Sequence, residues 1–168
     1  LPLICDAGVS LSGLVYGEKL EEAAAGTQSG QQTGDGSGVC SYSLDLRPQF
    51  DYYAHIYGVY NSAPFTLNLN SLLMSAGLTQ RIFDVWLADG FCLTDNSPGL
   101  RIFPDELAAA VTFNRPEELI GLMRGFTDAP GRKEELRRAW KSEILEKHTY
   151  RKRLEGLLGE LRRTGALR

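Results

Sequence analysis

Mostly apolar runs and amphipathic stretches alternate along the chain, and this alternation predicts strands and helices in turn. The apolar runs are rich in β-branched, aromatic and leucine side chains. A glycine, asparagine or aspartate follows each of them, which is typical of short buried strands. We predict strands at residues 9–16, 65–69, 91–94 and 110–113.

The remaining stretches have helical composition or carry leucine and aromatic side chains at helical spacing. We predict helices at residues 18–25, 52–60, 78–88, 116–126, 131–147 and 150–163. A further short helix is predicted to begin at Pro104, because Asp105 and Glu106 follow it where the helix dipole favours acids. Residues 3–7, closed by Gly8, have the pattern of the last turns of a helix, so we expect the chain to start inside an element.

This order of elements predicts one α/β domain over residues 1–168. Strands that alternate with helices are joined by right-handed parallel crossovers. We therefore expect a Rossmann-like, open parallel sheet with helices on both faces and a helical C-terminus.

Residues 26–38 interrupt the pattern, because they contain five glycines and no apolar side chain. Such a segment cannot bury surface to offset its ordering entropy, so we predict a flexible loop. The loop is either a tolerated surface insertion or a lid over a site.

The composition, with 43% hydrophobic and 23% charged residues, is that of a globular protein and excludes disordered and collagen-like classes. No apolar run approaches the roughly 20 residues of a membrane helix. The N-terminus also lacks the basic-then-apolar pattern of a signal peptide. We expect a cytoplasmic protein without a membrane span.

The three cysteines and two histidines are far apart in the sequence: Cys5, Cys40, Cys92, His55 and His148. An odd and scattered set of cysteines indicates neither a disulfide framework nor a zinc site, so we interpret them as small buried hydrophobes. We expect chemistry that uses no protein-bound metal and no cofactor.

Charge is unevenly distributed. Residues 131–168 hold 12 Lys/Arg against 6 Glu, which leaves 6 Lys/Arg against 15 Asp/Glu before them. Acids interleave with bases at helical spacing in this basic part, which is more typical of a solvated helix face than of a nucleic-acid surface. Nucleic-acid binding is therefore only an alternative.

Polar residues follow the predicted strands. In an open parallel sheet the ligand crevice lies beyond the carboxyl ends of the strands, beside helix N-termini with free N–H groups. This rule selects Tyr16, Gly17, Asn68, Asn70 and residues 94–99. The hydroxyl, amide and carboxylate groups of residues 95–99 suit sugar hydroxyls or a phosphate, although the same residue types are also common turn formers.

Asp84 stands in an otherwise apolar part of the helix predicted at residues 78–88, one turn after Arg81. A carboxylate there must be paired or bound, because burying a lone charge is costly. It can form an i,i+3 ion pair with Arg81 and nothing more. Alternatively, Asp84 accepts hydrogen bonds from both hydroxyls of a ribose, and Arg81 offers a fork of donors to a phosphate.

His148 ends one predicted helix and Thr149 precedes the next. This position suits the imidazole to the C-terminal dipole and Thr149 to an N-cap. No nucleophile or carboxylate stands beside His148 in the sequence, so we assign no catalytic residue.

Three groups of motifs occur in order along the chain: VYN at 59–61 with LNLN at 67–70, GLTQRIFDV at 77–85 with GFCLTD at 90–95, and HTYR at 148–151 with Arg153. Together they resemble the C-terminal domain of group-1-like glycosyltransferases of the CgeB (spore maturation protein) type, which have the GT-B fold. LVYG at 14–17 fits an earlier strand of the same family, and the resemblance runs from roughly residue 7 to 158.

The resemblance implies that the chain binds a nucleotide-diphosphate sugar, as a substrate, for transfer to an acceptor. Asp84 matches the acidic position expected to bind ribose, Arg81 the family arginine, and residues 94–95 the loop that faces the donor. Related enzymes carry a glutamate at the position of Ala76. The whole expected donor site comprises Gly17, Asn70, Arg81, Asp84, Thr94, Asp95 and Asn96.

The resemblance also implies an N-terminal acceptor domain and a first strand that are missing from this chain, which we expect to be inactive alone. Basic side chains would stabilise the leaving diphosphate, Arg81 first and Arg101 second. One alternative is a non-catalytic Rossmann-like module whose helical C-terminus binds a partner protein. Another is a nucleic-acid binder that uses the basic helices.

Overall fold

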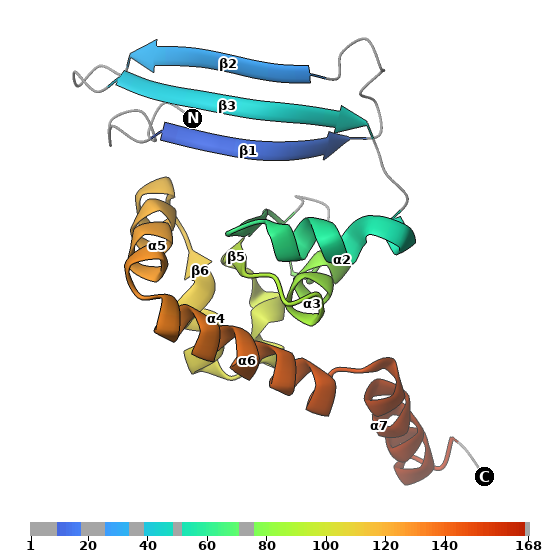
Figure 1. Ribbon diagram of the computed structural model, residues 1–168. Coiled ribbons are helices and arrows are strands. Elements are labelled where there is room, and N and C mark those ends of the chain that lie inside the picture. The colour runs from blue at the N-terminus through green and yellow to red at the C-terminus, as the bar shows by residue number, and fades with distance from the viewer. Residues whose placement is uncertain (1–9, 18–25, 34–38, 49–51, 71–75, 167–168) are drawn as a thin grey trace. The chain divides into compact units, whose positions relative to one another are not determined.

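The computed structural model describes residues 10–17, 26–33, 39–48, 52–70 and 76–166 (Figure 1). The chain divides into two compact units, Leu1–Ile56 with Asn114–Arg124, and Tyr57–Phe113 with Gly125–Arg168. Each unit has a three-stranded sheet of its own. That residues 1–168 form a single domain stays a prediction.

The sheet of the first unit has the order β1-β3-β2, with β1 at Ser10–Gly17, β2 at Gly26–Thr33 and β3 at Val39–Pro48. Strand β3 runs parallel to β1 and antiparallel to β2. Strand β1 confirms the prediction at residues 9–16. Strand β3 was missed, although apolar and polar residues alternate strictly over residues 40–47, which is the signal of a strand.

The prediction of a flexible loop over residues 26–38 is wrong for Gly26–Thr33, which form β2. The backbone of β2 pairs with β3 along its whole length, from Gly26 opposite Leu46 to Thr33 opposite Val39. Main-chain hydrogen bonds to β3 hold this edge strand, although it has no apolar side chains. The prediction of a loop considered only the burial of apolar side chains and left these hydrogen bonds out. Residues 34–38 lie outside the described residues.

The sheet of the second unit is parallel, in the order β4-β5-β6. Its strands are β4 at Thr66–Asn68, β5 at Cys92–Asp95 and β6 at Thr112–Phe113. The connections contain the helix α3 at Gln80–Leu87, the 3₁₀ turn η3 at Pro98–Ile102, and the helix α4 at Asp105–Val111. This alternation confirms the predicted α/β, Rossmann-like class, although the last strand is shorter than predicted because residues 110–111 end α4.

The remaining described helices also confirm the predictions: α2 at Tyr52–Ser62, α5 at Pro116–Asp128, α6 at Pro130–Lys147 and α7 at Tyr150–Arg163. The helices predicted at residues 3–7 and 18–25 lie outside the described residues.

Two tryptophans form the centre of the second unit. Ile82, Val85 and Trp86 recur on one face of α3 and are buried, which is why that face packs against α6 (Figure 1). The rings of Trp86 and Trp140 stack with centroids 5.1 Å apart and an interplanar angle of 3°. Phe103 contacts Trp140 edge-on, with centroids 4.6 Å apart. This cluster holds α6 against α3.

Gly90 lies where α2, α3 and the start of β5 come together. A Cβ atom on Gly90 would lie 2.8 Å from the carbonyl oxygen of Tyr60 and 3.1 Å from that of Val85. Both are backbone atoms, so neither moves without its helix. We expect Gly90→Ala to lower the free energy of unfolding by about 1–3 kcal/mol. Denaturant unfolding followed by tryptophan fluorescence measures it, because Trp86 and Trp140 both lie in this unit.

The matched control is Gly125→Ala in α5, where a Cβ meets nothing within 4 Å. There alanine is expected to raise the free energy of unfolding by about 0.5–1 kcal/mol, because it restricts the unfolded chain and favours the helix. Equal stabilities of the two variants would contradict the close packing of backbone atoms around Gly90.

Candidate functional site

A buried amide joins the carboxyl ends of β4 and β5 to the start of α3. Asn68 donates from Nδ2 to Thr94 Oγ1 at 3.1 Å, and its Oδ1 accepts from Thr79 Oγ1 at 2.8 Å. Asn68 is 0% exposed and Thr94 is 2% exposed. Thr79 is the N-cap residue of α3, but its side chain makes no hydrogen bond to the first turn of that helix. The hydroxyl that would cap α3 is directed to Asn68 instead.

A second pair lies just beyond the first. Asp95, the last residue of β5, accepts at Oδ1 from the backbone nitrogen of Asn70 at 2.9 Å and from Asn70 Nδ2 at 2.8 Å. The Oδ1 atom of Asn70 is buried and has no hydrogen-bond partner in the described part of the chain. Asn68, Asn70, Thr79, Thr94 and Asp95 are called the carboxyl-edge cluster below.

The turn after β5 is fixed against the loop before α3. The buried Ser97 donates from Oγ to the carbonyl of Gly77 at 2.9 Å and accepts from the backbone nitrogen of Gly99 at 3.3 Å. Asn96 is exposed, and its backbone nitrogen donates to the carbonyl of Phe113 at 3.1 Å. Asn96 therefore follows the cluster directly on the surface.

The side chain of Arg81 forms a hydrogen bond with the Tyr60 side chain in α2, and the charge of Asp84 also acts on the Tyr60 hydroxyl. Burial raises the pKa of Tyr60, the charge of Arg81 and a hydrogen bond from it lower that pKa, and the charge of Asp84 raises it. Both members of the predicted pair therefore influence the Tyr60 hydroxyl electrostatically. Sequence reasoning did not assign Tyr60 to the site, although it lies in the VYN motif.

The predicted site residues therefore fall into groups. The structure pairs Asn70 with Asp95, beside Thr94. It places Arg81 and Asp84 on α3, the helix that starts at the cluster. Gly17 ends β1 in the other compact unit, and its part in the site stays a prediction.

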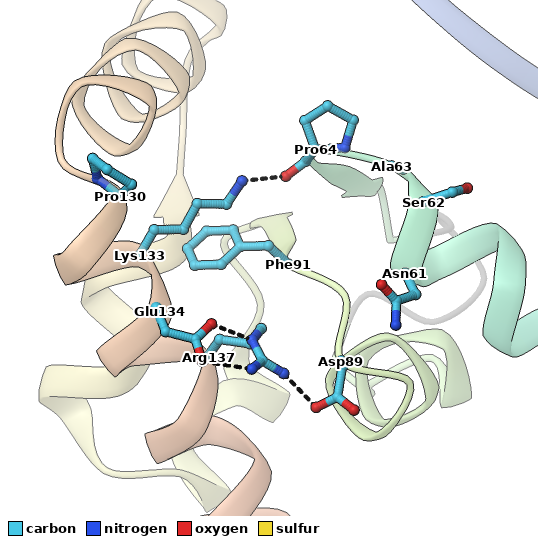
Figure 2. Close-up of a pocket in the computed structure, with 10 residues that line it drawn as sticks. All are labelled: Asn61, Ser62, Ala63, Pro64, Asp89, Phe91, Pro130, Lys133, Glu134 and Arg137. Carbon is cyan, nitrogen blue, oxygen red and sulfur yellow. Dashed lines mark hydrogen bonds and ion pairs between the residues drawn. The ribbon is translucent and has the colours of Figure 1, made fainter.

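A pocket of about 340 Å³ lies at the opposite ends of the same strands (Figure 2). Pro64 and Phe91, which line it, precede β4 and β5, whereas the carboxyl-edge cluster follows them. Lys133 donates from Nζ to the carbonyl of Pro64 at 2.6 Å and lies 4.0 Å from the centroid of the Phe65 ring. Burial lowers the pKa of Lys133.

The acidic side chains of this pocket are held by neighbouring bases. Asp89 accepts from Lys141 at 2.7 Å, from Tyr57 at 3.0 Å and from Arg137, which also pairs with Glu134 (Figure 2). The bond from Lys141 is the main reason why the pKa of Asp89 is lowered. We assign a structural role to these charges. No local signal in the sequence reveals the pocket, because its lining comes from three separate segments.

The surroundings of His148 and Cys92 indicate structural roles for both side chains. The imidazole lies 4.8 Å from the Phe103 ring centroid, and its Nε2 is 3.6 Å from Glu143 Oε1, too far for a normal hydrogen bond. Burial is the main reason why its pKa is lowered. Thr149 caps α7 by accepting from the backbone nitrogen of Lys152 at 3.3 Å, as predicted. Burial raises the pKa of Cys92 to about 12, which keeps the thiol protonated.

Over the part of the chain that the structure describes, no helix combines the length and the apolar character needed to cross a membrane. The same residues contain no group of three or more His, Cys, Asp or Glu side chains that could hold a metal ion.

Comparison with known proteins gives one family. A family model described as "Glycosyl transferase-like" matches residues 36–159, which is more than half of the chain and includes the whole carboxyl-edge cluster. No curated protein and no solved structure matches the chain.

Proposed function

The chain belongs to the glycosyl transferase-like family, and from that membership we propose that it binds the donor, a nucleotide-diphosphate sugar, for transfer to an acceptor. The observation that carries the proposal is the carboxyl-edge cluster. It gathers amide, hydroxyl and carboxylate groups where β4 and β5 end and α3 begins, which is where open parallel sheets bind nucleotides.

The start of α3 is suited to the diphosphate. The side chain of its N-cap residue, Thr79, is engaged with Asn68 and does not cap the first turn, where the N–H of Ile82 donates to the carbonyl of Thr79 at 3.3 Å. In this proposal the N–H groups of Gln80 and Arg81 face the anion. Arg81 lies in the first turn of the same helix and adds a positive charge. In this proposal Arg81 stabilises the charge that develops on the leaving diphosphate, and Arg101 has a secondary part.

Asp84 is the proposed ribose ligand. It lies one turn after Arg81, and a carboxylate can accept hydrogen bonds from both ribose hydroxyls. Thr94, Asp95, Asn96 and Asn70 complete the proposed donor site. We propose further that an acceptor domain of the GT-B type supplies the other half of the active site, so that this chain alone binds donor but does not transfer sugar.

Titration of the chain with UDP and with GDP tests donor binding. We expect one of the two to shift the amide resonances of Asn70, Asp84 and Asp95, because all three lie at the proposed site. Resonances of α7 serve as the internal control. If millimolar concentrations of both nucleotides moved none of the three, in this chain and in a longer protein that contains the acceptor domain, donor binding would be disproved.

One observation favours the alternative of a protein-interaction module. Helix α7 exposes large apolar side chains, with Tyr150 83% exposed and Leu154 and Leu157 each 56% exposed. A partner helix or groove could cover such a face. Silence toward nucleotides together with loss of a partner on Leu157→Glu would support this alternative.

A further inference from the structure

We propose that Asn70 and Asp95 form an acceptor pair that binds two neighbouring hydroxyl groups of the transferred sugar; this inference rests on the proposed donor-binding function. The nucleotide part of the donor would then lie toward α3, and the sugar would lie over the end of β5.

The hydrogen bonds between the two residues determine which oxygen atoms remain for a ligand. Asn70 donates to Asp95 Oδ1 twice, from its backbone nitrogen and from Nδ2, at 2.9 and 2.8 Å. Turning the amide over would place its oxygen against the carboxylate, so the orientation of the Asn70 side chain is determined. Within the described part of the chain, these hydrogen bonds leave two acceptor atoms without a donor, Asn70 Oδ1 and Asp95 Oδ2.

Of the two acceptor atoms, Asn70 Oδ1 is the stronger evidence for a bound ligand. This atom is buried, and native proteins rarely leave a buried side-chain oxygen without a donor. The surroundings hold it in place, because Asn68 ties the end of β4 to the buried Thr94 at 3.1 Å. A site that is already ordered loses little entropy when a ligand binds.

The chemistry of the pair selects the part of the donor that it can hold. Both free atoms are acceptors and one belongs to a carboxylate, so a phosphate would be repelled while hydroxyl groups can donate to both. A divalent cation could also use these two oxygens if water completed its shell, and titration in EDTA separates that case from direct binding of hydroxyls. Two hydroxyls on adjacent sugar carbons supply the two donors that the pair lacks.

The test compares nucleotides with nucleotide sugars on the full chain. UDP and UDP-glucose, and GDP and GDP-mannose, are titrated calorimetrically in EDTA against the unchanged chain and Asp95→Asn. We expect the unchanged chain to bind the sugar conjugate at least about tenfold more tightly than its nucleotide. Asp95→Asn replaces the acceptor Oδ2 by a donor, so the affinities of this variant for the nucleotide and for its sugar conjugate should fall within about twofold of each other.

Asp128→Asn is the matched control, because it removes an exposed carboxylate from the end of α5. It should leave both affinities unchanged. Donors that lack one sugar hydroxyl test the same idea on the unchanged chain, independently of how the variant folds. Removal of one of two adjacent hydroxyls should cost about tenfold in affinity.

The outcomes separate this inference from the proposed function. Equal loss of nucleotide and conjugate affinity in Asp95→Asn would assign the pair to the ribose and overturn the inference, while donor binding would stand. The inference would also be overturned, and donor binding would stand, if the chain bound nucleotide and conjugate equally well. A preference for the conjugate that appears only when Mg²⁺ is added would have the same meaning. Failure to bind any nucleotide would overturn the proposed function and the inference together.

Discussion

Replacement of Trp140 by alanine is expected to lower the free energy of unfolding of the second unit by about 3–5 kcal/mol. Trp140 is 0% exposed. Its ring stacks on that of Trp86 with centroids 5.1 Å apart and forms a T-shaped contact with that of Phe103, with centroids 4.6 Å apart. Alanine removes these contacts and leaves a cavity that neighbouring rings cannot fill without moving α6. Denaturant unfolding followed by far-ultraviolet circular dichroism measures the loss.

Two further variants show whether the effect comes from packing. Trp140→Phe keeps an aromatic ring and removes the indole Nε1, which is buried without a partner among the described residues, so it should cost well under half as much as alanine. Leu154→Ala in α7 truncates a side chain that is 56% exposed and should change stability by less than about 0.5 kcal/mol. A loss below about 1 kcal/mol for Trp140→Ala would refute the stacked core.

Asn68→Ala is expected to lower the free energy of unfolding by about 2–4 kcal/mol and to weaken nucleotide binding as well. Asn68 is fully buried, and its loss leaves the hydroxyls of Thr94 and Thr79 without the partners that lie 3.1 and 2.8 Å away. The end of β4 would no longer be tied to α3, so the proposed donor site would lose its order.

The companion variant Thr94→Val completes a double-mutant cycle with Asn68→Ala. The two residues share a hydrogen bond, so we expect the double variant to lose clearly less stability than the sum of the single losses. Asn61→Ala, at an exposed position of α2, is the control and should change stability by less than about 0.5 kcal/mol. Additive losses at Asn68 and Thr94 would mean that the bond contributes nothing.

The elements of the second unit were predictable because their signals are local. Periodic leucine and aromatic positions indicated α6 and α7, and short apolar runs followed by asparagine or aspartate indicated β4 and β5. Strand β2 was mispredicted for the opposite reason. Gly26–Thr33 has no strand signal of its own, and pairing with β3 decides its structure.

The sequence predicted where the candidate site lies, but not the hydrogen bonds that connect its residues. The rule for parallel sheets selected Asn70 and Asp95 from their place after two strands, and the structure pairs them. The role of Asn68 as the buried link and the place of Tyr60 beside Arg81 were not foreseen. Hydrogen bonds between residues 26 positions apart in the sequence leave no local pattern.

The sequence by itself determined the α/β class, most element bounds in the second unit, and the edge of the sheet at which polar residues gather, because periodicity and strand ends are properties of neighbouring residues. Only the tertiary structure decided which oxygen atoms are already occupied. The parallel register sets Asn68 beside Thr94, and the bonds from Asn70 use one oxygen of Asp95. Which acceptors remain for a ligand depends on contacts between separate strands, and no single segment of the chain encodes them.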